Sequence, residues 1–146
     1  LYSCHPRSRN RLIASGFQLD PRVQVQQPLG FHDYNCLQMK AYAVVSDSGT
    51  LPEESSFFTS VGYPFPAVCI RTSTERPESL DEAGFILSGI DTNGLLQSVD
   101  IAVELVKNGD YGTPVPNYTD ENVSTKVVKI IQSYVGVVNK MVWRKF

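Results

Sequence analysis

The sequence contains little cysteine, and its cysteines form no recognisable pattern. The three residues Cys4, Cys36 and Cys69 are widely separated along the chain. An odd number of cysteines closes no disulfide framework, and their spacing does not fit a zinc site. We therefore expect reduced cysteines in the core and no metal centre.

The sequence also lacks long hydrophobic runs and an excess of basic residues. The apolar runs at 41–45 and 66–70 are far shorter than the roughly 20 residues that a membrane span needs. No basic flank followed by an apolar segment resembles a signal peptide. With a net charge of −2, the chain offers no basic surface to neutralise a nucleic-acid backbone. We expect a cytosolic (cytoplasmic) protein with no membrane segment and no nucleic-acid partner.

The remaining composition suits a single folded unit. A chain of 146 residues with 42% hydrophobic content can bury one normal core. Its first residues, Leu1 to Cys4, include no initiator methionine and are typical of the inside of a strand. We interpret residues 1–146 as one domain cut from a longer protein.

Strand patterns alternate with helix patterns along the chain. Apolar or alternating runs predict strands at 1–4, 22–26, 43–45, 67–70 and 85–89. Helices are predicted at 8–15, 33–40, 50–60 and 92–106. Parallel strands need helical crossovers, so this order predicts an α/β fold: a doubly wound, Rossmann-like parallel sheet with helices on both faces.

Two segments after the last predicted strand have other characters. The stretch 108–120 is rich in glycine and proline and has no periodicity, which is typical of a connector. Residues 122–145 predict a long C-terminal helix, because apolar side chains recur at helical spacing from Val123 to Val142. We expect its apolar side to dock on a neighbouring domain or on the sheet.

The loop after the strand at 43–45 has the features of an anion site. Ligands of doubly wound sheets bind beyond the carboxyl ends of the strands. Gly49 permits a close approach of the backbone, and the free N–H groups at the start of the next helix suit a phosphate. Glu54, one turn further on, can accept hydrogen bonds from adjacent ribose hydroxyls. The alternative for Thr50 and Glu53 is a capping box with only a structural role.

The loop after Ile70 carries Arg71 and Arg76. Either arginine could bind a phosphate, or both could pair with Glu75 and Glu78 on a solvated surface. The surface arrangement is the more common one for charges at this density.

Other candidate residues have equally common structural roles. His5 and Arg7 follow the first predicted strand and face the same edge, where a lone histidine is more often structural than catalytic. Phe31 and Tyr34 flank a turn before a helix, where an aromatic ring either stacks on a base or packs in the core.

Taken together, these motifs resemble the UDP-N-acetylglucosamine 2-epimerase family, whose members have the two-domain fold called GT-B. The resemblance is carried by Asp47-Ser48-Gly49, by Glu53-Glu54, and by the run from Thr74 to Glu78 after the next strand. It extends from His5-Pro6-Arg7 to Gly89 and, more loosely, through the final helix. It implies that the chain is the C-terminal half of a GT-B fold.

The resemblance also implies roles for individual residues. In the UDP site that it implies, the diphosphate contacts Ser48, Gly49 and Thr50, the ribose contacts Glu54, the uracil lies against Tyr34 and the backbone near Leu29, and Arg76 completes the site. His5 and Arg7 are further, weaker candidates. No catalytic acid or base is assigned, because the family carries these in the N-terminal domain, which this chain lacks.

The implied reaction inverts C2 of a UDP-linked 2-acetamido sugar by eliminating UDP and adding it back, without a nicotinamide or any other cofactor. Thr50 stands where the family more often has a second glycine. This feature resembles the branch that forms UDP-N-acetyl-L-fucosamine for surface polysaccharide. Implied partners are the protein's own N-terminal domain and a second copy in a homodimer. The alternatives are a GT-B glycosyltransferase and a UDP-sugar-binding module without chemistry.

Overall fold

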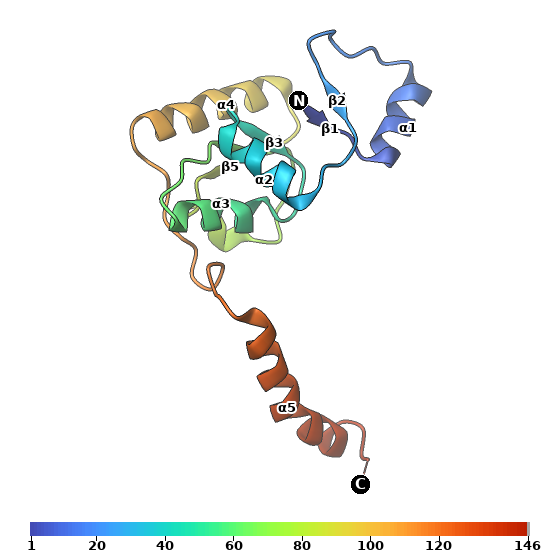
Figure 1. Cartoon of the computed structure of the whole chain (residues 1–146), viewed down its shortest axis with the longest axis vertical. Helices are drawn as coiled ribbons and strands as arrows, with labels where there is room; N and C mark the ends of the chain where they lie inside the picture. The colour runs from blue at the N-terminus through green and yellow to red at the C-terminus, as the bar shows by residue number, and fades with distance from the viewer. Residues whose placement is uncertain (146) are drawn as a thin grey trace.

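Strands and helices alternate along the chain as the sequence predicts (Figure 1). The computed structural model describes residues 1–145. Its elements are β1 (Tyr2–Ser3), α1 (Pro6–Ser15), β2 (Val25–Gln26), α2 (Phe31–Lys40), β3 (Val44–Ser46), α3 (Leu51–Ser60), β4 (Ala67–Cys69), the 3-10 turn η1 (Pro77–Ser79), β5 (Phe85–Leu87), α4 (Thr92–Lys107) and α5 (Val123–Met141).

The strands form two parallel sheets, so the α/β class is confirmed while the single continuous sheet is not. β1 pairs with β2, and β4 lies between β3 and β5. In the larger sheet Val44 is opposite Ala67, and Ala67 is opposite Phe85. β1 and β2 contribute only two residues each, which is too little pairing to extend the larger sheet. The predicted strand at 22–26 is therefore shorter than expected.

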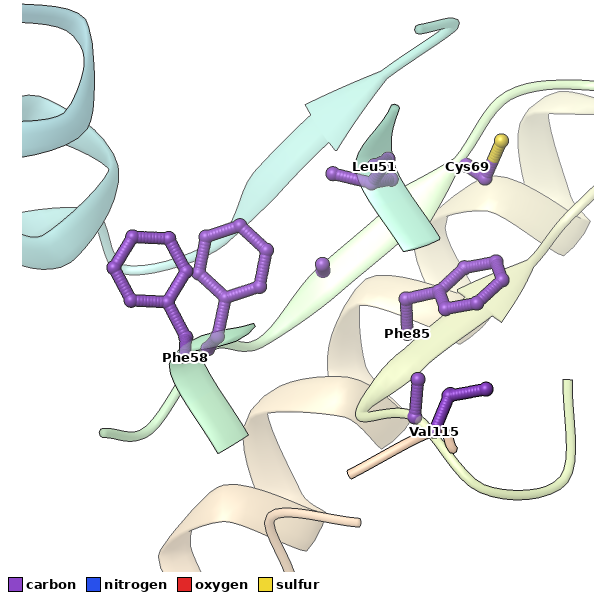
Figure 2. Close-up of a cluster of buried hydrophobic side chains, with 8 residues drawn as sticks. Leu51, Phe58, Cys69, Phe85 and Val115 are labelled. Carbon is purple, nitrogen blue, oxygen red and sulfur yellow. The ribbon is translucent and has the colours of Figure 1, made fainter. Parts of the chain in front are cut away.

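The core lies between α3 and the larger sheet. Leu51, Ser55 and Phe58 occupy one face of α3 and are buried, and all three residues of β4 are buried as well. Figure 2 shows Leu51 near Cys69 of β4, Phe85 of β5 near Val115, and Phe58 at the other end of the same cluster. Full burial of a leucine such as Leu51 stabilises the fold by about 2 kcal/mol. This packing fixes the start of α3 against β4 and β5.

α4 covers the opposite side of the larger sheet from α3 (Figure 1). Ser98, Ala102 and Val103 are the buried residues of this helix. Asp91 caps its first turn by accepting a hydrogen bond from the amide of Gly94 at 2.8 Å. The larger sheet thus has helices on both faces, as the sequence predicts.

The segment 108–120 is more than a connector, because part of it belongs to the core. Val115 is 1% exposed. Its amide donates to Ser56 Oγ at 2.8 Å, and Thr59 Oγ1 donates to the carbonyl of Tyr111 at 2.9 Å. These bonds join the segment to α3. The glycine and proline content of the segment did not predict this burial.

α5 extends away from the α/β body and has no buried residue (Figure 1). The predicted docking of this helix on the sheet is therefore wrong. Docking on a neighbouring domain stays a prediction. Across residues 1–145, no helix combines the length and the apolar character that crossing a membrane requires.

Two local predictions of burial also fail. Val45 of β3, predicted to lie in a buried strand, is 43% exposed. β3 is an edge strand of the larger sheet, and Val45 lines the cavity described below. Cys4 and Cys69 are buried as expected, whereas Cys36 is exposed on α2. All three cysteines are free thiols.

Candidate functional site

A cavity of about 1250 Å³ is lined by residues of β1, α2 and β3, along the whole length of both strands. Four of the residues predicted for the site line it: His5, Arg7, Leu29 and Tyr34. The others, Ser48, Gly49, Thr50, Glu54 and Arg76, lie outside its lining. Hydrogen bonds nevertheless connect Glu54 and the β3–α3 loop to the cavity through a side chain of α2, as described below.

The β3–α3 loop is held by its own hydroxyl groups. The amide of Ser48 donates to Ser46 Oγ at 3.0 Å, and the amide of Thr50 donates to Ser48 Oγ at 3.3 Å. Within residues 1–145 the amide of Gly49 has no hydrogen-bond acceptor. The N–H groups that were expected to be free at the start of the helix are thus partly used, since the amide of Leu51 donates to the carbonyl of Ser48 at 3.4 Å. Among the amides of residues 48–50, serine hydroxyls accept from two, and that of Gly49 is free.

The carboxylate of Glu54 is held in place on both sides. Gln38 Nε2 donates to one of its oxygens at 2.7 Å, and Thr50 Oγ1 donates to the other at 3.0 Å. Ser48 Oγ lies 2.9 Å from Thr50 Oγ1 and extends the network. Because each carboxylate oxygen can accept two hydrogen bonds, Glu54 keeps acceptor capacity for ligand hydroxyls.

The capping-box alternative for Thr50 and Glu53 is not realised. Thr50 occupies the position before α3, but its side chain makes no capping hydrogen bond. Its hydroxyl is used for Glu54, and Glu53 is paired elsewhere, with Arg76. Of the two residues that a local motif assigned to helix capping, Thr50 thus bonds within the first turn of α3, and Glu53 makes a long-range contact.

Arg76 lies against the first turn of α3. Its Nε is 2.8 Å from Glu53 Oε1, and both side chains are partly exposed. This hydrogen bond raises the pKa of the Arg76 guanidinium. The predicted surface pairing with Glu75 or Glu78 is wrong for Arg76, because Glu53 is its carboxylate partner.

Arg71 forms the predicted surface ion pair with Glu75 and also lies close to the β3–α3 loop. Its guanidinium forms two hydrogen bonds of 2.8 Å with the carboxylate of Glu75. A Cβ atom added at Gly49 would be 3.5 Å from Arg71 Nη1. Arg71 is therefore the cation beside the free amide of Gly49. Its place directly after the strand was a usable signal, although only Arg76 was assigned to the site.

Gln38 of α2 is the second residue that the sequence did not single out. It is 6% exposed and lines the cavity while it donates to Glu54. Its Oε1 atom is buried and has no hydrogen-bond partner in the described part of the chain. The only sequence signal was a polar residue at an apolar position of a predicted helix.

The aromatic and histidine candidates have different surroundings. Tyr34 is half-buried, and its pKa is raised first by burial and then by the negative charge of Glu54. The phenol and the carboxylate are thus electrostatic neighbours. His5 Nδ1 accepts a hydrogen bond from the amide of Arg7 at 3.3 Å at the start of α1, which favours a structural role for His5. Arg7 is exposed.

Within residues 1–145, no group of three or more histidine, cysteine, aspartate or glutamate side chains is arranged to hold a metal ion. What the site offers is therefore hydrogen-bond acceptors and donors. The carboxylate is that of Glu54, one turn into α3. The free amide of Gly49 lies near Arg71, and Tyr34 lines the cavity.

Curated proteins similar to this chain carry one name. The chain is 27% identical over 135 residues to the UDP-N-acetylglucosamine 2-epimerase of Methanococcus maripaludis, covering 90% of this chain and 34% of the relative. It is 26% identical over 112 residues to the protein of the same name from Methanocaldococcus jannaschii, covering 74% of this chain and 29% of the relative. The chain thus spans about a third of the length of these relatives.

Solved structures share the fold. The structure of UDP-GlcNAc 2-epimerase from Methanocaldococcus jannaschii matches with a TM-score of 0.64 and 23% identity, over 88% of this chain and 35% of that one. A putative UDP-N-acetylglucosamine 2-epimerase from Listeria monocytogenes matches with a TM-score of 0.65 and 23% identity, over 92% and 35%. A family model described as UDP-N-acetylglucosamine 2-epimerase matches residues 1–132. The chain belongs to the UDP-N-acetylglucosamine 2-epimerase family.

Proposed function

We propose that this chain is the UDP-binding, C-terminal domain of a non-hydrolysing UDP-sugar 2-epimerase. The observation that carries the proposal is the carboxylate of Glu54, held by Gln38 and Thr50 one turn after the free amide of Gly49. An acceptor for vicinal hydroxyls therefore lies next to donors for phosphate. Membership of the epimerase family supports the same assignment.

The base, ribose and diphosphate of UDP can each be assigned to neighbouring residues of the site. Leu29 and Tyr34 border the cavity and offer an apolar and an aromatic surface to the base. Glu54 would accept hydrogen bonds from the ribose, and Gly49 and Arg71 would meet the diphosphate. Arg76 would complete the site after exchanging part of its contact with Glu53 for a phosphate oxygen.

The chemistry explains why binding the diphosphate matters. C2 of a 2-acetamido sugar is not adjacent to a carbonyl group, so direct removal of its proton is costly. In the proposed route the C2–H and C1–O bonds break, UDP leaves with the electron pair of the C1–O bond, and a C1–C2 double bond forms. A proton then returns to the other face of C2, and UDP adds back at C1. Cationic and amide donors stabilise the leaving diphosphate.

The finer assignments rest on fewer residues. Thr50, in place of a second glycine, donates to Glu54 and supports the branch that forms UDP-N-acetyl-L-fucosamine for surface polysaccharide. The acid and base that move the C2 proton, the N-terminal domain, the homodimer and the cytosolic location stay predictions.

The proposal is tested by solvent exchange in the intact protein. Incubation in deuterium oxide with UDP-N-acetylglucosamine, or with UDP-N-acetyl-L-fucosamine, should place deuterium at C2, and the preferred substrate identifies the branch. Transfer of the sugar to an acceptor, without exchange at C2, would instead support a glycosyltransferase. Tight UDP binding with neither reaction would support a binding module. The matched control is a Glu54→Gln variant, in which exchange should fall with UDP affinity.

A further inference from the structure

We propose that Gln38 is a specificity-determining residue of this site, which fixes Glu54 through its amide nitrogen and accepts a hydrogen bond from a ribose hydroxyl through Oε1. The inference rests on the proposed function, since it assigns a new contact within the same nucleotide site.

The orientation of the Gln38 amide follows from its partner. An ionised carboxylate only accepts hydrogen bonds, so the NH₂ group of Gln38 must face Glu54 Oε2, at 2.7 Å. The amide oxygen then faces away from Glu54. This oxygen is buried and has no partner among the residues described, and the whole residue is 6% exposed. A buried acceptor without a donor costs free energy, which a ligand hydroxyl would recover.

The position of Gln38 selects the ribose as the source of that hydroxyl. Gln38 lines the cavity one helical turn after Tyr34, so both side chains lie on the same face of α2. The base is proposed to lie against Tyr34, and the ribose is the next group of a nucleotide. Gln38 is also bonded to Glu54, whose free lone pairs are proposed for the same ribose. A vicinal diol could therefore bond to both residues at once.

The test compares ribose analogues in the intact protein by calorimetry. UDP, 2′-deoxy-UDP and 3′-deoxy-UDP are titrated into the wild type and into Gln38→Met, which keeps the length of the side chain but removes both polar atoms. The Met variant should bind UDP about tenfold more weakly. The loss should shrink for the analogue that lacks the contacted hydroxyl. Asn35→Met, on the same helix but outside the cavity lining, should bind all three ligands like the wild type.

Each outcome decides the proposal. An equal loss for UDP and both analogues would show that Gln38 acts only through the fold, and unchanged UDP affinity would remove Gln38 from the site. If Gln38→Met does not fold, Gln38→Asn keeps the amide on a shorter side chain, and its loss should likewise shrink for the analogue that lacks the contacted hydroxyl. A wild-type protein that does not bind UDP would overturn the proposed function itself. A wild type that binds UDP, with no effect at Gln38, would overturn only this inference.

Discussion

Glu54 is the residue on which the nucleotide site depends most. Both of its oxygens accept hydrogen bonds from the protein, yet it stays partly exposed and can accept more. Glu54→Ala should weaken UDP binding at least tenfold, because hydrogen bonds to a charged group contribute about 1.5–3 kcal/mol. Calorimetry measures this loss, and Glu104→Ala on α4 is the matched control, since Glu104 is exposed and its ion pair is with Lys107 of the same helix. UDP affinity unchanged in the Glu54 variant would remove this residue from the site.

The raised pKa of Tyr118 predicts how the stability of the fold depends on pH. Burial and a hydrogen bond to Glu78 raise the pKa of Tyr118 to about 12, above its ordinary value of 10.0. A raised pKa means that the folded state favours the neutral phenol. The stabilising effect is therefore complete below pH 10 and is lost as the pH rises through about 12.

Urea unfolding at a series of alkaline pH values measures this effect. The wild type should lose stability across that window, and Tyr118→Phe should lose less. An equal loss in both proteins would show that the pKa of Tyr118 is not raised in the folded state.

At this scale the sequence predicted residue types better than their partners. Gly49 and Glu54 were chosen because a glycine before a helix and a carboxylate one turn later suit a nucleotide. In the structure Gly49 precedes α3 and Glu54 lies in its first turn, while their roles in binding stay predictions. The sequence could not show that Glu53 pairs with Arg76 across 23 positions, or that Gln38 reaches Glu54. Such contacts depend on how α2 and η1 pack beside α3, which no local pattern encodes.

At the scale of elements, the turn at Gly112 decides whether the segment 108–120 can pack. Gly112 has a φ of 73°, and a Cβ atom there would lie 2.5 Å from the carbonyl oxygen of Glu82 and 2.8 Å from the amide of Gly84. Gly112→Ala should therefore destabilise the protein by about 3 kcal/mol or more, through clash as well as backbone strain.

Gly109 in the same segment provides the matched comparison. Its φ is 82°, but a Cβ atom there would meet nothing within 4 Å. Gly109→Ala should cost only about 1 kcal/mol of backbone strain. Thermal unfolding of the two variants separates the cost of the steric clash from that of backbone strain. Equal losses of stability would contradict the close packing of Gly112 against residues 82–84.

Elements with strong periodicity were predicted well, and short ones were not. The helix predicted at 92–106 is α4, Thr92–Lys107, because its apolar face is regular and Asp91 caps it. The alternating run at 22–26 contributes only Val25–Gln26 to a strand. A two-residue strand forms only where the fold brings a neighbouring strand within hydrogen-bond distance, so its extent depends on tertiary packing.

At the scale of the whole molecule, the sequence predicts the apolar face of α5 but does not identify what this face packs against. Its apolar residues recur at helical spacing as predicted, yet the helix has no buried residue. In proteins, most of the stability of an amphipathic helix comes from packing of its apolar face. We therefore keep the prediction that its apolar face packs on a neighbouring domain.

Substitution of a central apolar residue of α5 tests this prediction. In the intact protein Ile131→Asp should lower the free energy of unfolding by about 3 kcal/mol, because it would bury a charge in that contact. Gln132→Asp, at an adjacent polar position, should change it by less than about 0.5 kcal/mol. Equal, small effects measured by urea unfolding would indicate that α5 is uncovered in the intact protein too.

The measurement that tests the central claim most directly is a crystal structure of the intact protein with UDP. The account predicts density for the diphosphate beside the amide of Gly49 and Arg71, with ribose hydroxyls within hydrogen-bond distance of Glu54. UDP bound elsewhere, or the corner at the start of α3 left empty at saturating ligand, would contradict the claim.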